Sequence, residues 1–268
     1  MLGNPWDYAT WSLVVTLGLL MLAACEIGYR HGYRWGREQS EHARTVSNMV
    51  KASILGLVTF LLGFSFSMTS TRHEIRRKVV LDEANAIGTL DLRATLLQQP
   101  EQYQLRSALR KLVRLRLALP NLSNAPDELD ATRKALVSEL DVVWSAVQRA
   151  HEKSPQSVLV SQIVPSANEV IDLNTTRYWA ANSHMPAAVL VMLAACAVVA
   201  CMLIGHSCGQ TERRHAGLWF ALITLFGLTL YVILDFDRPT LGVVRVDHTP
   251  LEQVQKSFEA NPLSPPPE

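Results

Sequence analysis

Residues 52–71 read ASILGLVTFLLGFSFSMTST, and residues 72–78 continue as RHEIRRK. The first stretch carries no charge and has the length at which an α-helix, rising about 1.5 Å per residue, crosses a hydrocarbon core of about 30 Å. No Pro or Gly interrupts residues 69–87, so we expect the helix to continue from the apolar stretch into the charged one. The stretch predicts a membrane helix that leads directly into a soluble domain.

Three further windows resemble this one, at residues 10–29, 186–205 and 216–234. Together the four windows contain a single charged residue, Glu26, although 18% of the chain is charged. The first window could also be a signal peptide, but residues 1–9 lack the Lys or Arg that such a peptide carries before its apolar core. We therefore expect the first window to be a retained membrane helix.

The residues between the second and third windows have the pattern of amphipathic helices. Leu105, Leu109 and Leu112 recur at helical spacing, and prolines separate one such segment from the next. We predict an all-α integral membrane protein with four transmembrane helices and a helical soluble domain inserted between helices 2 and 3. The expected parts are residues 1–68, with helices at about 10–29 and 49–71; the soluble domain, 69–183; residues 184–236, with helices at about 186–205 and 216–234; and an extended segment with a disordered Pro-rich tail, 237–268.

Several function classes have no support in the sequence. A net charge of +1 provides no field for binding nucleic acid. No nucleotide-binding loop and no zinc-protease or serine-hydrolase motif is present, and the cysteines and histidines match no zinc spacing. Acidic residues such as Glu83 and Glu169 lie on segments patterned for packing, so we expect them to be solvated or salt-bridged. We predict no enzyme activity, no cofactor and no metal site.

One face of the second window has an unusual composition. Small, aromatic and hydroxyl residues follow one another at helical spacing, which is typical of a helix that lines a pore with phenyl rings at its constriction. The same pattern is also compatible with helix packing through Gly56 and Gly63, with the hydroxyls bonded back to the backbone. The residues of this face are Ser53, Gly56, Phe60, Phe64, Ser67 and Thr71.

Two charged groups outside the windows are further candidates. Arg106, Arg110 and Arg114 recur every four residues and could attract anions or lipid head groups, but we expect a plain solvated helix face instead. Asp235 and Asp237 follow the fourth window, at a helix end whose dipole disfavours acids. We therefore expect these two acids to pair with a basic residue such as Arg238.

Several phrases of the sequence resemble those of a known family. Residues 60–64, FLLGF, followed by Thr71-Arg72, resemble the second-helix signature of the bestrophin ion channels. The wider pattern is similar to the bacterial bestrophin-like membrane proteins. Its phrases here are residues 83–89, EANAIGT, with Arg93; residues 168–173, NEVIDL, with Arg177; His184 with Pro186; and residues 235–239, DFDRP.

The resemblance implies a homo-oligomer, in that family a pentamer, around a central pathway for inorganic ions in the bacterial cytoplasmic membrane. Helix 2 would line the neck with Phe60 and Phe64, and the family's third neck position falls on Gly56. The soluble domain and the termini would be cytoplasmic. The acidic calcium clasp of the animal proteins has no counterpart. The family-motif polar residues are Arg72, Glu83, Asn85, Arg93, Asn168, Glu169, Asp172, Arg177, Asp235, Asp237 and Arg238.

Two functional hypotheses follow. The first is an oligomeric ion channel with a pore along helix 2, surrounded by membrane lipid. The alternative is a non-conducting membrane sensor or scaffold whose helical soluble domain binds a partner. The first hypothesis requires a ring of subunits, whereas the second is compatible with a monomer or dimer, so the oligomeric state discriminates between them.

Overall fold

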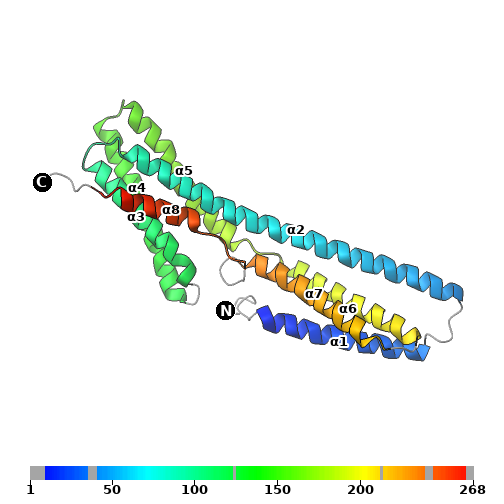
Figure 1. Cartoon of the computed structure of the whole chain (residues 1–268). Helices are drawn as coiled ribbons and strands as arrows, with labels where there is room; N and C mark the ends of the chain where they lie inside the picture. The colour runs from blue at the N-terminus through cyan, green and yellow to red at the C-terminus, as the bar shows by residue number, and fades with distance from the viewer. Residues whose placement is uncertain (1–9, 36–40, 123–124, 212–213, 239–243, 264–268) are drawn as a thin grey trace. The chain divides into compact units, whose positions relative to one another are not determined.

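A computed structural model describes residues 10–35, 41–122, 125–211, 214–238 and 244–263. All regular secondary structure in these ranges is helical, as the sequence predicts (Figure 1). The helices are α1 (Thr10–Trp35), α2 (Glu41–Ala94), α3 (Glu101–Ala118), the short 3-10 helix η2 (Leu119–Leu122), α4 (Pro126–Lys153), α5 (Val158–Asn182), α6 (Ala187–Gln210), α7 (Ala216–Asp237) and α8 (Thr249–Ala260).

The chain divides into two compact units. Unit 1 comprises residues 1–72 and 184–238, and unit 2 comprises residues 73–183 and 239–268. Helix α2 belongs to both units, because its 54 residues form one uninterrupted helix of about 80 Å. The expectation that this helix continues past its apolar stretch is therefore confirmed.

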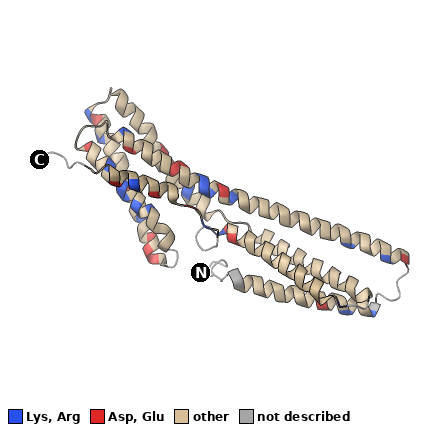
Figure 2. Ribbon diagram, viewed as in Figure 1, with Lys and Arg blue, Asp and Glu red and all other residues tan. Residues whose placement is uncertain are grey.

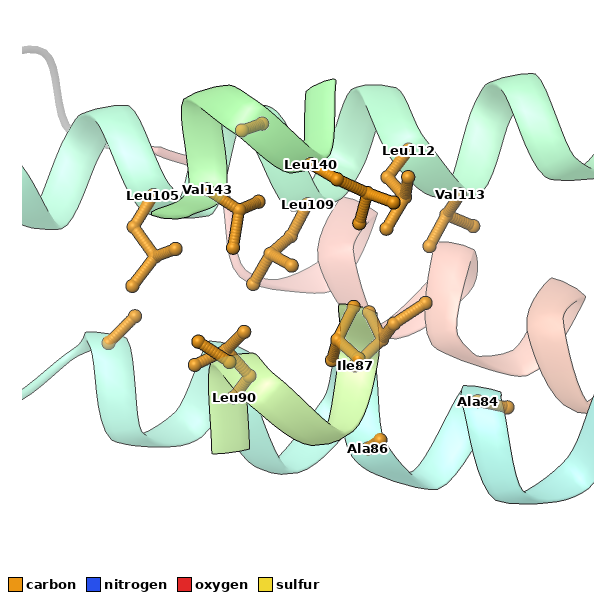
Figure 3. Packing of buried hydrophobic residues seen from close by; sticks show 14 of the residues in the cluster. Ala84, Ala86, Ile87, Leu90, Leu105, Leu109, Leu112, Val113, Leu140 and Val143 are labelled. Atoms are coloured by element: carbon orange, nitrogen blue, oxygen red, sulfur yellow. The ribbon is translucent and has the colours of Figure 1, made fainter. Parts of the chain in front are cut away.

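Unit 2 is built around one apolar core. The end of α2 contributes Ile87 and Leu90, which face Leu105 and Leu109 of α3 and Val143 of α4 (Figure 3). Helices α5 and α8 complete this core. Proline fixes two of the helix starts, since Pro126 opens α4 and Pro250 lies in the first turn of α8, where the missing N–H has no helical partner to lose.

The structure corrects the prediction for the C-terminal segment. An extended chain was expected from residue 237 onward, but Thr249–Ala260 form α8. Leu251 and Phe258 of this helix are buried in the core of unit 2. The amphipathic pattern of α8 is only 12 residues long, and its helix depends on packing against the rest of unit 2. Part of the Pro-rich tail, residues 264–268, lies outside the described residues.

Unit 1 contains a close contact between α1 and α6. Gly28 of α1 lies against the backbone of Met202, and Gly32 lies against that of His206. The two helices therefore run parallel, since the partner advances by four residues when the glycine does. A Cβ atom added at either glycine would lie 2.1 Å from the carbonyl oxygen of its partner. Gly205 and Gly209 of α6 make the reciprocal contacts. We call this set of four glycines the glycine contact.

Four helical stretches among the described residues are long and apolar enough to cross a membrane. They lie within Ser12–Arg34, Glu41–Ala94, Val158–Gln210 and Ala216–Asp237. Figure 2 shows long tan stretches without charged residues in α1, α6 and α7 and in the first half of α2. The apolar windows of the sequence thus fall within helices of sufficient length.

Candidate functional site

The candidate pore face of α2 is exposed along its length. Phe60 is 67% exposed and Phe64 57%, and their rings stack with centroids 6.5 Å apart. Gly56, Ser67 and Thr71 are also exposed. The opposite side of the same helix is buried and packs within unit 1, through Val58, Leu62, Ser65 and Thr69. The described residues of the chain therefore leave two aligned phenyl rings largely uncovered.

The glycines of this face make no close contact. Apart from the helix's own neighbouring backbone, no atom of the described residues lies within 4 Å of a Cβ atom added at Gly56 or Gly63. Packing through these two glycines was the alternative interpretation of the face, and it is not found within the described part of one chain. The close-packed glycines of unit 1 are instead those of the glycine contact.

The hydroxyl groups of the same helix bond to its backbone. Ser53 donates to the carbonyl oxygen of Met49 at 3.0 Å, and Thr71 donates to that of Ser67 at 2.9 Å. Such bonds satisfy a hydroxyl in apolar surroundings and leave its oxygen able to accept a further hydrogen bond. Arg72, which follows Thr71, contacts the Met68 sulfur at 3.9 Å.

The family-motif acid Glu83 lies at the centre of a buried ion pair network in unit 2. The carboxylate is fully buried, accepts a hydrogen bond from Arg116 Nε at 2.7 Å, and forms a second ion pair with Arg177. Arg116 also donates to Asn174 Oδ1 at 2.6 Å. A buried carboxylate that is shared by two guanidinium groups has a structural role, because removing it would leave two unpaired charges. Of the two roles expected for Glu83, solvated or salt-bridged, the structure has the second.

Arg116 was not predicted as a site residue, although the sequence contains a signal for it. Arg116 continues the spacing of Leu105, Leu109 and Leu112 on the buried face of α3. A charged residue in an apolar row predicts a buried ion pair.

His248 extends this network. Arg177 lies 3.3 Å from its Nδ1 atom. Burial, followed by the charge of Arg177, lowers the pKa of His248 to about 4. The ring is therefore neutral at physiological pH, when both guanidinium groups are charged.

A second polar contact ties α2 to α5. Arg93 donates to the carbonyl oxygen of Gln162 at 2.7 Å and to the Ser166 hydroxyl. Arg76, which was not among the predicted site residues, donates to the carbonyl oxygens of Ala180 and Ser183 at 3.0 and 2.7 Å. Both arginines thus hold backbone groups of unit 2 in place.

Four other motif residues lie on the surface. They are Asn85, Asn168, Glu169 and Asp172. These residues line an open hollow between α2 and α5, together with Asp82, Pro165, Leu173 and Thr176. No group of three or more His, Cys, Asp or Glu side chains in the described ranges has an arrangement that could hold a metal ion.

The motif at the end of α7 is buried in unit 1. Asp237 Oδ1 accepts a hydrogen bond from the backbone N–H of Met185 at 2.9 Å, and Oδ2 lies 3.4 Å from His184 Nδ1. Asp235 and Arg238 are buried beside it. The partners of Asp237 are thus His184 and Met185, which lie just before Pro186 and the start of α6.

The basic face of α3 is not the solvated surface that was expected. Arg106 pairs with Asp91 at 2.9 Å, and both side chains are nearly buried. Arg110 donates to the carbonyl oxygen of Phe258 at 2.8 Å and lies over the phenyl ring of that residue. Only Arg114 of the three is exposed. The preference for a solvated face is wrong for Arg106 and Arg110, because α2 and α8 cover their side of α3.

Comparison with known proteins agrees with these observations. A family model described as the Bestrophin-like domain matches residues 12–251. A variant of a bacterial bestrophin homologue from Klebsiella pneumoniae has the same fold, with a TM-score of 0.68, 14% identity, and coverage of 96% of this chain and 97% of that one. Another structure of the bacterial bestrophin homologue from Klebsiella pneumoniae gives a TM-score of 0.63 at 15% identity, over 91% and 94% of the chains. No curated protein matches the sequence significantly.

The apolar helices and the shared fold mark an integral membrane protein. The family match covers most of the chain, and the protein belongs to the bestrophin-like family. The resemblance seen in the sequence is thereby confirmed.

Proposed function

We propose that the chain is one subunit of an oligomeric, bestrophin-type ion channel and that α2 lines its pore. The observation that carries this proposal is the pair Phe60 and Phe64, which stack on an open face of α2 while the opposite side of the helix is buried. In a ring of subunits, these phenyl groups would form a hydrophobic neck of the kind that gates by excluding water.

Gly56 and the hydroxyl residues support the same proposal. With no side chain at Gly56, the pathway would be wider there than at the two rings. Ser67 and Thr71 would follow the rings on the same face, and their hydroxyl oxygens could accept hydrogen bonds from water that accompanies an ion. The aromatic neck would then lie between a wide segment and a polar one.

The membrane arrangement is part of the proposal. α1, α6, α7 and the first half of α2 would cross the bacterial cytoplasmic membrane, with unit 2 and both termini on the cytoplasmic side. The parallel course of α1 and α6 supports four crossings, because helices that are first and third in a four-span chain must point the same way. Membrane lipid would surround the remaining apolar faces.

Ion flux into liposomes tests the proposal. Purified protein is reconstituted, and the flux of a small cation and a small anion is measured against empty vesicles. We expect flux of at least one of the two ions above that of empty vesicles. Absence of both, from protein shown to be folded and inserted, would contradict the channel and favour the non-conducting scaffold.

A further inference from the structure

Lys51 of α2 is a buried cation with uncharged partners. Its side chain lies in unit 1, only 7% of the residue is exposed, and its Nζ donates to Ser207 Oγ at 3.0 Å and to Gln210 Oε1 at 3.3 Å. An ammonium group has three N–H donors, so one donor remains after these two bonds. Neither acceptor carries a charge, and a buried charge is normally paired.

Two histidines adjoin this lysine. His31 of α1 and His206 of α6 have their Nδ1 atoms 3.3 Å apart and their ring centroids 5.3 Å apart. Lys51 and His31 both lie close enough to act electrostatically on His206. Ser207, which accepts a hydrogen bond from Lys51, directly follows His206 in α6, so the lysine lies near the pair of histidines. Its charge is not offset by its bonded partners.

Among the described residues, the neighbouring acid Glu26 does not supply the missing anion. Glu26 accepts hydrogen bonds from Arg30 at 2.8 Å and from Arg214 at 3.1 Å, so its single negative charge is already shared by two guanidinium groups. The described parts of residues 26–51 and 207–215 contain five Lys or Arg side chains and two acids, Glu26 and Glu41, so they carry a surplus of positive charge. A metal ion between the two histidines is disfavoured by the neighbouring ammonium group, and no third metal-ligating side chain joins them in the described ranges.

The position along the helices indicates which anion fits. Lys51 directly precedes the uncharged stretch 52–71, and Ser207 and Gln210 directly follow the apolar window 186–205. If these helices cross a membrane, which rests on the proposed function, the side chains of Lys51, His31 and His206 lie at the depth of the lipid head groups. The anion available at that depth is the phosphate of a phospholipid.

We propose that Lys51, His31 and His206 form a binding site for a phosphate oxyanion, which in the membrane is the head group of an anionic phospholipid. The remaining N–H of Lys51 donates to a phosphate oxygen, and the imidazole N–H that is not used between the two histidines supplies a further donor. The lipid would thereby hold together α1, α2 and α6 at one end of unit 1.

Lipid binding by the full-length protein tests this site. The protein in neutral detergent is titrated with short-chain phosphatidylglycerol, and bound lipid is measured by native mass spectrometry. The Lys51→Met variant is compared with Lys134→Met, which removes an exposed lysine of unit 2. Loss of one charged hydrogen bond predicts about tenfold weaker lipid binding for Lys51→Met and no change for Lys134→Met. Equal binding by all three proteins would overturn the site.

Further arms separate the source of the phosphate and guard against misfolding. Tight binding of inorganic phosphate, with phosphatidylglycerol no better, would retain the oxyanion site and overturn the lipid assignment. Zinc binding that His31→Gln abolishes, with lipid binding unchanged, would overturn both the oxyanion site and the lipid assignment.

A second pair of variants is used if Lys51→Met does not fold. Lys51→Arg should keep lipid binding, and His31→Gln, at an exposed position, should weaken it. Loss of binding in Lys51→Arg together with unchanged binding in His31→Gln would contradict the site. Flux is measured separately, so a protein that binds lipid without conducting counts only against the channel.

Discussion

Glycine has opposite surroundings in two regions of unit 1. In the glycine contact between α1 and α6, the backbones approach so closely that an added Cβ would lie 2.1 or 2.2 Å from a carbonyl oxygen. On the open face of α2, Gly56 and Gly63 have free space around them, and two phenyl rings are exposed. The first region is complete within one chain, and the second leaves an apolar surface that lipid or another copy must cover. Small residues on a membrane helix therefore indicate packing only when a partner backbone is present.

The largest expected change in stability concerns the buried ion pair network of Glu83, which is polar and is complete within the chain. Glu83→Ala leaves Arg116 and Arg177 buried without their shared carboxylate, which costs about 4 kcal/mol of unfolding free energy. Glu169→Ala, which removes an exposed acid of the neighbouring hollow, should change the unfolding free energy by less than about 0.5 kcal/mol. Thermal or denaturant unfolding of both variants in detergent measures this difference. Equal stability of the two would show that the network is not a structural anchor.

Exchanging glycine for alanine in the two regions is the next test. Gly28→Ala places a methyl group against the Met202 carbonyl, and the forced separation of α1 and α6 should cost about 3 kcal/mol. Gly56→Ala meets no neighbour and should be neutral or stabilising by up to about 1 kcal/mol, because alanine favours the helix. Unfolding midpoints of the two variants in the same detergent give the comparison. A larger loss for Gly56→Ala would reverse the distinction between the regions.

Substitution of the two phenyl rings should change ion flux much more than stability. Phe60→Ala combined with Phe64→Ala removes exposed rings, so we expect less than about 1 kcal/mol of lost stability within the chain. The same double variant should change ion flux into liposomes by about threefold or more, since a hydrophobic constriction would be lost. Leu218→Ala in α7, also exposed, is a matched control for removal of an exposed apolar side chain and should leave flux unchanged. Equal flux in all three proteins would contradict the neck.

A smaller effect of pH is expected in unit 2. The folded chain holds the pKa of His248 near 4, below its value of about 6.5 in an unfolded chain. Between these values the unfolded state binds more protons, so stability should fall as pH is lowered from about 6.5 toward 4. His248→Gln should flatten this part of the profile, which unfolding midpoints measured at several pH values would show. An unaltered profile would mean that other groups cause the dependence.

The sequence predicts features that depend on local pattern. The uncharged windows, the continuous helix of α2 and the leucine rows of α3 all follow from the spacing of residues along one helix. The family phrases also identified Glu83 and Arg177, although not that they contact each other.

Features that depend on contacts between different helices were either not predicted or predicted wrongly. Gly28 and Gly32, like Gly205 and Gly209, have the Gly-x-x-x-Gly spacing of closely packed membrane helices, but this spacing does not show which two helices face each other. Gly56 and Gly63 are seven residues apart and have no such partner. The helix α8 was missed because its burial depends on α3. Arg106 and Arg110 were assigned to solvent because their partners, Asp91 and Phe258, come from distant parts of the chain.

The central claim is that further copies of the chain complete the open face of α2. The most direct measurement is the mass of the intact assembly, by native mass spectrometry from a mild detergent or lipid nanodisc. The channel predicts a closed ring of several copies, with five expected from the family resemblance, and no monomer at low detergent. A stable monomer or dimer would contradict the pore and favour the non-conducting scaffold.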